Sequence, residues 1–346
     1  MTRRELLASL PSLAAPVPSV GSFERIDIHV HIHRDAPRLI SSMQKAGWRA
    51  LSICVCPAMK PGDVTDLDGE LSATAKLSRD SDGRMAWAAT FDARDFEKPD
   101  FPERTAALLN RCFQQGAVAA KVWKNVGLGI LSRSGEYLLP DNPALMPVYE
   151  AIQKSGKSLF VHLAGTSGGW MPVDRNNPEY EYYRSHAEWN LYGRPGAPTK
   201  AAIMAARDRV LARFPRLRVI GCHIGSMEDD LDDAARHLDT YPNFVVDTAA
   251  KVRYLAYGSR ERVREFLLKY QDRVLYGTDF TLTARDEESA WKSLQATYER
   301  DWGLFSSAGK MQYGGRQVQG LALPDGVLRK IFYANAVRWL PGMVPK

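Results

Sequence analysis

Short apolar runs alternate with amphipathic stretches along this chain from about residue 24 onward. The runs are rich in Val, Ile, Leu and Phe and show little polar alternation, which is typical of parallel strands buried on both faces. Eight such runs are present, at 25–31, 49–55, 85–91, 117–123, 157–162, 217–223, 243–248 and 273–278.

The stretches between these runs carry apolar residues at spacings of three and four, which predicts helices. Gly116 and Gly156 follow two of them, where a helix is expected to end. The predicted helices are 66–79, 101–115, 142–155, 198–213, 226–240, 259–270 and 285–299, with a last one near 325–338. Eight strands alternating with helices favour a closed α/β fold, the (β/α)8 TIM barrel, over a doubly wound sheet. We therefore expect residues 23–346 to form one barrel domain.

Two connections are longer than a barrel requires. The first, 165–198, follows the fifth strand and therefore lies over the catalytic face of a barrel. Its many aromatic residues favour a packed lid, an extended insertion after that strand, over disorder. The second, 301–321, contains five glycines and is expected to be a long loop without regular structure.

Composition narrows the class of protein. The 346 residues are 45% hydrophobic and 25% charged, as in a globular protein. The net charge of +6 is mild, and no basic run of the kind that follows phosphates is present, so nucleic acid is not expected as a partner. The four cysteines, Cys54, Cys56, Cys112 and Cys222, lack the usual spacing of zinc or redox motifs and are expected to be buried free thiols.

The first 22 residues have a different character. Arg3 and Arg4 precede a short apolar stretch interrupted by prolines, which resembles an export signal of the twin-arginine type. This predicts a periplasmic or exported protein; without such export the chain would be cytoplasmic. No stretch reaches the roughly 18–20 apolar residues of a membrane-spanning helix, so stable insertion is not expected. The oligomeric state is left open, and a homo-oligomer is compatible with the sequence.

Four of the predicted strands end in residues that bind metals. His29 and His31 are two apart on the first strand, so the strand period of two points both rings to one side. His162 ends the fifth strand, His223 ends the sixth, and Asp279 follows the eighth. Barrel enzymes collect their chemistry at the carboxyl ends of the strands. Imidazoles and a carboxylate suit a borderline-soft divalent ion such as Zn²⁺.

The motifs IDIHVH, VHLAG, GCHIG and YGTDF resemble those of the amidohydrolase superfamily, in the branch called amidohydrolase-related or family 2. The resemblance runs over about residues 24–340, with the motifs in the family's order. It implies one divalent metal ion, zinc first and manganese next, held by His29, His31, His162 and Asp279. It also implies that His223 and Asp279 assist the chemistry.

The chemistry that follows is hydrolysis of a small carboxylate-bearing, amide- or lactone-like substrate. The metal would lower the pKa of a bound water and polarise the scissile carbonyl. Asp279 would take the proton from that water, and His223 would orient the water or stabilise the developing oxyanion. Non-oxidative decarboxylation of an aromatic or muconate-type acid uses the same ligands and remains the alternative. A metal- or solute-binding protein without catalysis is the third interpretation.

Candidate substrate contacts are basic or aromatic residues on the expected catalytic face. Lys121 and Lys124 lie at the end of the fourth strand, and Trp170, Arg184 and His186 lie in the insertion. Some members of the superfamily carboxylate a lysine of the fourth strand to bridge two metals, but the resembled branch holds one, so Lys121 is interpreted as a contact to substrate or to the ligands. A purely structural role for Lys121 stays open. Together with other loop cations, Lys251 and Arg253 among them, these residues predict a small anionic substrate. Asp247, which ends the seventh strand, is a candidate for supporting the ligands.

Overall fold

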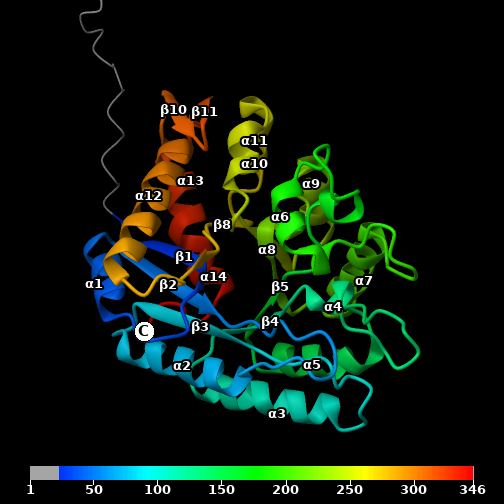
Figure 1. Ribbon diagram of the computed structural model, residues 1–346. Helices are drawn as coiled ribbons and strands as arrows, with labels where there is room; N and C mark the ends of the chain where they lie inside the picture. Colours follow the sequence, from blue (N-terminus) through cyan, green and yellow to red (C-terminus); the bar gives the residue numbers. More distant parts are fainter. Residues whose placement is uncertain (1–22, 346) are drawn as a thin grey trace, which may run out of the picture.

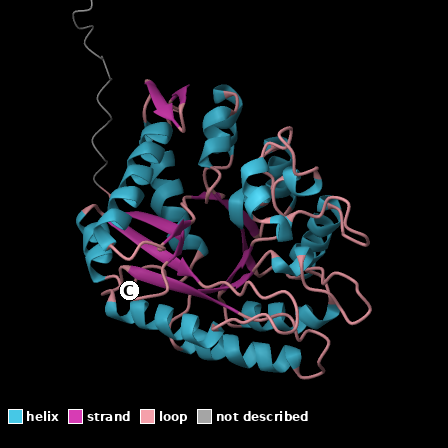
Figure 2. Cartoon of the chain, in the orientation of Figure 1, coloured by secondary structure: helices cyan, strands magenta, loops and turns pink. Residues whose placement is uncertain are grey.

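The fold is a parallel β-barrel surrounded by helices, seen in a computed structural model that describes residues 23–345 (Figures 1 and 2). The export signal predicted at 1–22 lies outside the described residues and stays a prediction. Nine parallel strands lie in the order β8-β7-β6-β5-β4-β3-β2-β1-β9. They are β1 (Arg25–His31), β2 (Trp48–Ile53), β3 (Met85–Thr90), β4 (Ala119–Val122), β5 (Ser158–Val161), β6 (Arg218–Gly221), β7 (Phe244–Asp247), β8 (Val274–Leu275) and β9 (Phe280–Thr281).

The eighth strand of the barrel is divided in two. Its first part, β8, pairs with β7, and its second part, β9, pairs with β1. The sequence predicted one strand over 273–278, and this was wrong beyond Leu275, where β8 ends; the strand resumes at Phe280, after Asp279, whose φ is 66°. Between the two parts, the backbone N–H of Ile28 donates to the carbonyl of Tyr276 at 3.0 Å. The barrel is therefore closed through this segment.

A buried carboxylate joins the first strand to this divided strand. Asp27 Oδ1 accepts hydrogen bonds from the backbone N–H groups of His29 and Thr278, at 3.0 and 3.1 Å. Its Oδ2 accepts from the hydroxyls of Thr278 and Tyr298, at 2.6 and 3.1 Å. Both oxygens are thus fully satisfied, as a buried carboxylate requires.

Helices cover the outside of the barrel (Figure 1). Five of them begin at a residue whose side chain accepts a backbone N–H, namely Asp66, Thr199, Asp230, Ser259 and Asp286. Gly116 and Gly156 have φ of 98° and 68° just beyond two helices, as the sequence predicted. The main helices are α1 (Pro37–Lys45), α2 (Leu67–Asp80), α3 (Phe101–Gln114), α5 (Met146–Lys154), α7 (Lys200–Arg213), α9 (Leu231–Thr240), α11 (Arg260–Lys269) and α12 (Glu287–Ser306).

Shorter elements complete the chain. The sequence did not predict α1, which has only nine residues and three buried positions. The predicted last helix is present as α13 (Asp325–Arg329), a π-helical turn (Lys330–Ala334) and α14 (Asn335–Trp339). Single turns of helix occur at α4 (Asn125–Leu128), α6 (Tyr180–Ser185), α8 (Cys222–Gly225) and α10 (Val252–Tyr257).

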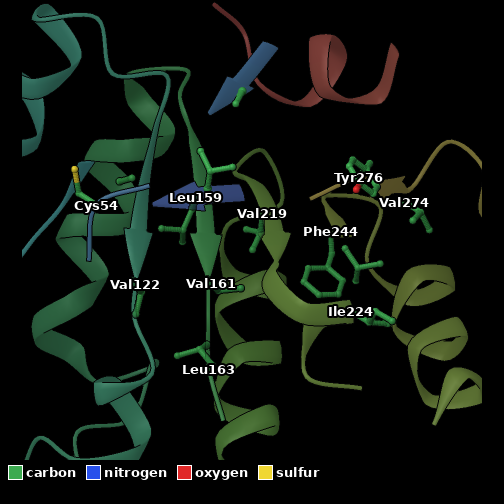
Figure 3. Close-up of a cluster of buried hydrophobic side chains, with 14 of the residues drawn as sticks. Cys54, Val122, Leu159, Val161, Leu163, Val219, Ile224, Phe244, Val274 and Tyr276 are labelled. Atoms are coloured by element: carbon green, nitrogen blue, oxygen red, sulfur yellow. The ribbon is translucent and has the colours of Figure 1, made fainter. Parts of the chain in front are cut away.

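The core has two layers. Alternate residues of the strands, such as Ile53, Phe160 and Ile220, fill the barrel interior, which Trp339 and Leu340 close at one end. The residues between them, including Leu159, Val219 and Phe244 in Figure 3, point outward and pack against the helices. This explains why the strands read as continuous apolar runs, since both of their faces are buried.

The two long connections differ from each other. The first is ordered, with the turn Ser167–Trp170, α6 and the turn Ala187–Trp189, and it buries Tyr183 and Trp189. The second was wrongly expected to lack regular structure. There α12 continues to Ser306, and a hairpin of β10 (Lys310–Tyr313) and β11 (Arg316–Gln319) follows. Gly314 and Gly315, with φ of 52° and 83°, form its two-residue turn, and such a glycine pair is a hairpin signal.

The cysteines are as predicted, since all four are free and buried. Within residues 23–345, no helix combines the length and the apolar character that crossing a bilayer demands.

The packing of Trp48 provides a test of the outer core. Its ring stacks on Tyr298 with centroids 3.7 Å apart, and the Arg25 guanidinium lies 4.7 Å from its centroid. We expect Trp48→Ala to lower the free energy of unfolding by about 3–5 kcal/mol, the usual cost of truncating a buried aromatic residue. Denaturant unfolding measures this, with the exposed Val64→Ala as the control, expected within about 0.5 kcal/mol of the parent. Unchanged stability of Trp48→Ala would contradict the packing described.

Candidate metal centre and active-site cavity

A bulge in β1 aims the first two histidines into the barrel. The pairing of β1 with β2 shifts register between Asp27 and Val30. Before the shift, Ile26 and Ile28 belong to the interior, whereas after it Val30 belongs to the outer layer. The extra residue of a bulge re-aims the side chains beyond it. As a result, His29 and His31 both face inward, at the carboxyl end of the strand.

Asp279 meets these two rings. Its Oδ1 lies 3.3 Å from His29 Nε2 and 3.2 Å from His31 Nε2. Its backbone N–H donates to the carbonyl of His29 at 2.8 Å, which fixes the residue against β1. The left-handed φ of 66° is costly for a residue other than glycine, and such strain is often found at functional sites.

The other nitrogens of both rings have their own partners. His29 Nδ1 donates to Asp247 Oδ2 at 2.8 Å, and His31 Nδ1 donates to the carbonyl of Ile53 at 2.7 Å. In each neutral ring the Nε2 therefore carries a lone pair. Burial lowers the pKa of His29 well below its ordinary value, and the nearby Lys121 adds to this effect, so the neutral ring is favoured.

His223 stands beside this group in an unusual backbone conformation. Its φ is 61°, because the chain turns sharply after β6 where the sequence predicted continued strand. Asp247 Oδ1 accepts its backbone N–H at 2.7 Å, and its Nδ1 donates to the carbonyl of Ala249 at 2.8 Å. Burial lowers the pKa of His223 to about 4. Burial also raises the pKa of Asp247 to about 6, although the N–H of His223 opposes this.

His162 contacts His223 and completes the set of predicted residues. Its Nδ1 lies 3.1 Å from His223 Nε2, and its ring is edge-on to that of His223. One ligating atom from each of His29, His223 and Asp279 lies within 4.8 Å of the others. This trio contains His223, which the resemblance assigned to chemistry, while the polar contact of the predicted ligand His162 is with His223.

These residues fit a divalent cation. Two imidazole lone pairs converge on one carboxylate oxygen in a buried place, and a positive charge between them removes their mutual repulsion. Each ring is oriented by a further acceptor, as is usual for metal-binding histidines. Lys121 Nζ, 1% exposed, lies 3.0 Å from His29 Nε2.

A cavity of about 310 Å³ opens over this group. His162, His223 and Asp279 lie on its wall, together with aromatic residues of the insertion, Tyr182, Tyr183 and Trp189. Lys124, Lys251 and Arg253 line it as well. A larger cavity of about 780 Å³ shares Glu179, Glu228 and Arg253 with it but contains none of the three catalytic candidates, so we place the reaction in the smaller one.

The three cations of the cavity differ in their partners. Lys251 Nζ lies 2.8 Å from Glu228 Oε1, and Arg253 pairs with Glu179. Among the described residues, Lys124 has no carboxylate within ion-pairing distance. It donates to the Tyr182 hydroxyl at 2.6 Å and lies 4.3 Å from the centre of the Trp189 ring. Burial lowers its pKa to about 8.

Three predicted substrate contacts lie elsewhere. Arg184 is exposed and pairs with Glu181, His186 is exposed and stacks on Tyr182, and Trp170 donates to the carbonyl of Pro198. None of them is among the residues that line the cavity, and neither is the predicted contact Lys121, which lies against His29 Nε2. The sequence did not single out Glu179 or Glu228. Their signal is weak, because a glutamate in a loop is usually solvated and only the fold shows that Glu228 is buried and that Glu179 is largely covered.

A family model described as Amidohydrolase matches residues 26–342. No curated protein matches the sequence.

Solved structures resemble the fold at low sequence identity. A 2,6-dihydroxybenzoate decarboxylase from Rhizobium has a TM-score of 0.54 and 16% identity, over 92% of this chain and 98% of that one. A dihydroxybenzoic acid decarboxylase from Polaromonas sp. JS666, with bound manganese and the inhibitor 2-nitroresorcinol, has a TM-score of 0.52 and 16% identity, over 92% of this chain and 97% of that one. A 4-oxalomesaconate hydratase from Rhodopseudomonas palustris has a TM-score of 0.51 and 13% identity, over 92% of this chain and 96% of that one. At these identities the likeness establishes the barrel fold.

The role of Asp247 can be tested directly. We expect Asp247→Asn to weaken metal binding by about 10- to 100-fold, because the amide cannot accept from His29 Nδ1 and from the N–H of His223 at once. Competition with a chelator measures this affinity. The matched control is Asp35→Asn, which removes an exposed carboxylate paired with Lys76. Equal affinities in Asp247→Asn and the parent would show that this carboxylate does not orient the ligands.

Proposed function

This chain belongs to the amidohydrolase family, and on that premise we propose that it is a metal-dependent hydrolase of a small carboxylate-bearing, amide- or lactone-like substrate. The observation that carries the proposal is the position of Asp279 Oδ1, held between His29 Nε2 and His31 Nε2 beneath the cavity. His162 and His223 stand on the wall of the same cavity.

The ligands in this proposal are His29, His31, Asp279 and His162, with zinc or manganese as the ion. When bound, such an ion acts as a Lewis acid that makes water more acidic and polarises a carbonyl. Asp279 is placed to accept a proton, because the His29 and His31 nitrogens beside its Oδ1 carry lone pairs and donate no hydrogen bond to it. The same carboxyl group can then return the proton to the leaving group.

In this proposal His223 positions a water molecule and keeps its protonation state during the reaction. His223 commits its Nδ1 proton to the carbonyl of Ala249, so its Nε2 presents a lone pair toward His162. In the hydrolytic proposal, His223 therefore receives a hydrogen bond from water or from His162 and holds water near Asp279. Because His223 Nε2 presents a lone pair and no proton to the cavity, it can hold a water but cannot protonate a carbanion, which favours attack by water over decarboxylation.

The substrate is proposed to be anionic because Lys124 is a buried ammonium group that has no carboxylate partner within residues 23–345. A substrate carboxylate would pair with it in the cavity, and a charge-assisted hydrogen bond of this kind is strong in a site of low dielectric. The rings of Trp189 and Tyr182 beside it favour a planar molecule.

The second candidate is non-oxidative decarboxylation of an aromatic or muconate-type acid. An unpaired ammonium group among aromatic rings suits such an acid as well as it suits an anionic amide or lactone. The decarboxylases with similar folds share the barrel.

Isotope-labelled water separates the two reactions. We expect incorporation of ¹⁸O from solvent into product without release of CO2, and removal of the metal by a chelator should abolish turnover until the metal is restored. In Asp279→Asn we expect turnover to fall by about 100-fold or more. Full turnover of this variant at normal metal content would disprove the role of Asp279. Release of CO2 without incorporation of ¹⁸O would establish the second candidate.

Substitution of Lys124 tests the class of substrate. We expect Lys124→Met to raise KM for a carboxylate substrate by about 10- to 100-fold, since a hydrogen bond to a charged group contributes roughly 1.5–3 kcal/mol. The neutral amide of the same substrate should be unaffected. Lys292→Met, which removes an exposed lysine paired with Glu288, is the control.

The pH profile gives a second measure of Lys124. Asp279 and Glu188 raise its pKa, whereas burial and the cations Lys121 and Lys251 lower it, to about 8. The ammonium form binds the anion, so KM for carboxylates should rise as pH passes 8. In Lys124→Arg this rise should vanish up to pH 10, because guanidinium keeps its proton. The same rise in both proteins would assign it to another group.

A further inference from the structure

Three side chains that the proposed function does not use gather behind the metal centre. His33 follows β1, Cys54 follows β2, and Glu70 lies in the first turn of α2. One ligating atom from each lies within 4.8 Å of the others. Cys54, labelled in Figure 3, belongs to the outer layer of the core, so the group lies on the far side of β2 from the barrel interior.

Hydrogen bonding determines which nitrogen of His33 is free. The Thr74 hydroxyl donates to the carbonyl of Glu70 at 2.7 Å, so its oxygen can only accept from His33 Nδ1, 2.9 Å away. His33 Nε2 consequently carries a lone pair. This atom is buried and has no hydrogen-bond partner among the described residues.

The free nitrogen faces a second acceptor. Glu70 Oε1 lies 3.6 Å from His33 Nε2 and also accepts the backbone N–H of Val55 at 2.7 Å. A lone pair on a nitrogen shut off from solvent that faces a carboxylate is unfavourable unless a cation lies between them. The 3.6 Å separation is compatible with two ligands of one ion at Zn–N and Zn–O distances of about 2.0–2.2 Å.

We propose that His33 Nε2, Cys54 Sγ and Glu70 Oε1 bind a second divalent metal ion of the zinc type, separate from the catalytic one. Imidazole, thiolate and carboxylate are a donor set that zinc accepts, and one thiolate with one carboxylate neutralises its two positive charges. Binding forms the metal–sulfur bond and releases the thiol proton to solvent. The side chains of His33 and Glu70, 22% and 23% exposed, give the ion a route from solvent.

This ion supports the catalytic ligands through the backbone. The carbonyl of Ile53, the residue before Cys54, accepts the Nδ1 proton of His31. A metal–sulfur bond at Cys54 fixes the end of β2, and so the carbonyl that orients His31. The second site is therefore structural, and it does not depend on which reaction the cavity catalyses.

Cobalt substitution tests the site independently of activity. The full chain is stripped of metal with a chelator and titrated with Co²⁺, while cobalt content and near-ultraviolet absorption are followed. The catalytic candidates are nitrogen and oxygen ligands, so a thiolate-to-cobalt charge-transfer band reports only a cysteine ligand. We expect that band, and about two equivalents of cobalt per chain, one for each proposed site.

Variants assign the band to a residue. Cys54→Ser should abolish it and remove one equivalent, whereas Cys56→Ser should retain both. Cys222→Ser is the second control, because Cys222 lies beside His29 and Asp247 and is the other cysteine near metal-binding groups. His33→Gln, at a partly exposed position, should also abolish the band and serves if Cys54→Ser does not fold. The absence of a band in the parent, or its loss in Cys222→Ser with retention in Cys54→Ser, would overturn the proposal.

Discussion

The buried carboxylate of Asp27 is the constraint on which the rest of the site depends. It ties the N–H of His29, on the first strand, to the N–H and hydroxyl of Thr278, beside the last. A barrel closes only where its first and last strands meet. Here they meet through backbone hydrogen bonds, such as that from Ile28 N–H to the Tyr276 carbonyl and the pairing of β1 with β9, and the Asp27 carboxylate adds a side-chain contact between them. This contact also places Asp279 next to His29 and His31, so the hydrogen bonds that close the barrel also bring the candidate metal ligands together.

Hydrogen bonds between strands also hold the candidate metal ligands in position. Asp247 holds both the ring of His29 and the backbone of His223, and carbonyls of neighbouring strands hold His31 and His223. Each ring thereby has one proton fixed and one lone pair directed inward. The cations that line the cavity are arranged similarly. Lys251 pairs with Glu228 and Arg253 pairs with Glu179, so Lys124 is the cation that we propose binds an anionic substrate. Within residues 23–345, the site thus combines a metal-binding group held by hydrogen bonds with a cavity-lining lysine, Lys124, that has no carboxylate partner.

Much of the fold was open to prediction because it depends on local pattern. Apolar runs buried on both faces predicted the strand centres, and Gly116 and Gly156 predicted the ends of two helices. Errors arose where a few residues decide the element. The nine residues of α1 are too few to show a helical period. The glycine pair 314–315 was interpreted as part of a loop and not as a hairpin turn. The eighth strand is interrupted between Leu275 and Phe280, a segment that contains the left-handed residue Asp279.

For the site, the sequence by itself determined which residues would gather, namely His29, His31, His162, His223 and Asp279, because the carboxyl ends of parallel strands meet at one face. Only the tertiary structure decided how they meet. The bulge in β1 that turns His29 inward, and the bond between His29 and Asp247 across 218 residues, have no local signal. The same holds for the partners of Lys124, and for the turn of Arg184 and His186 away from the cavity. Strand order follows from patterns that neighbouring residues carry, whereas side-chain partners follow from packing between segments far apart in the chain.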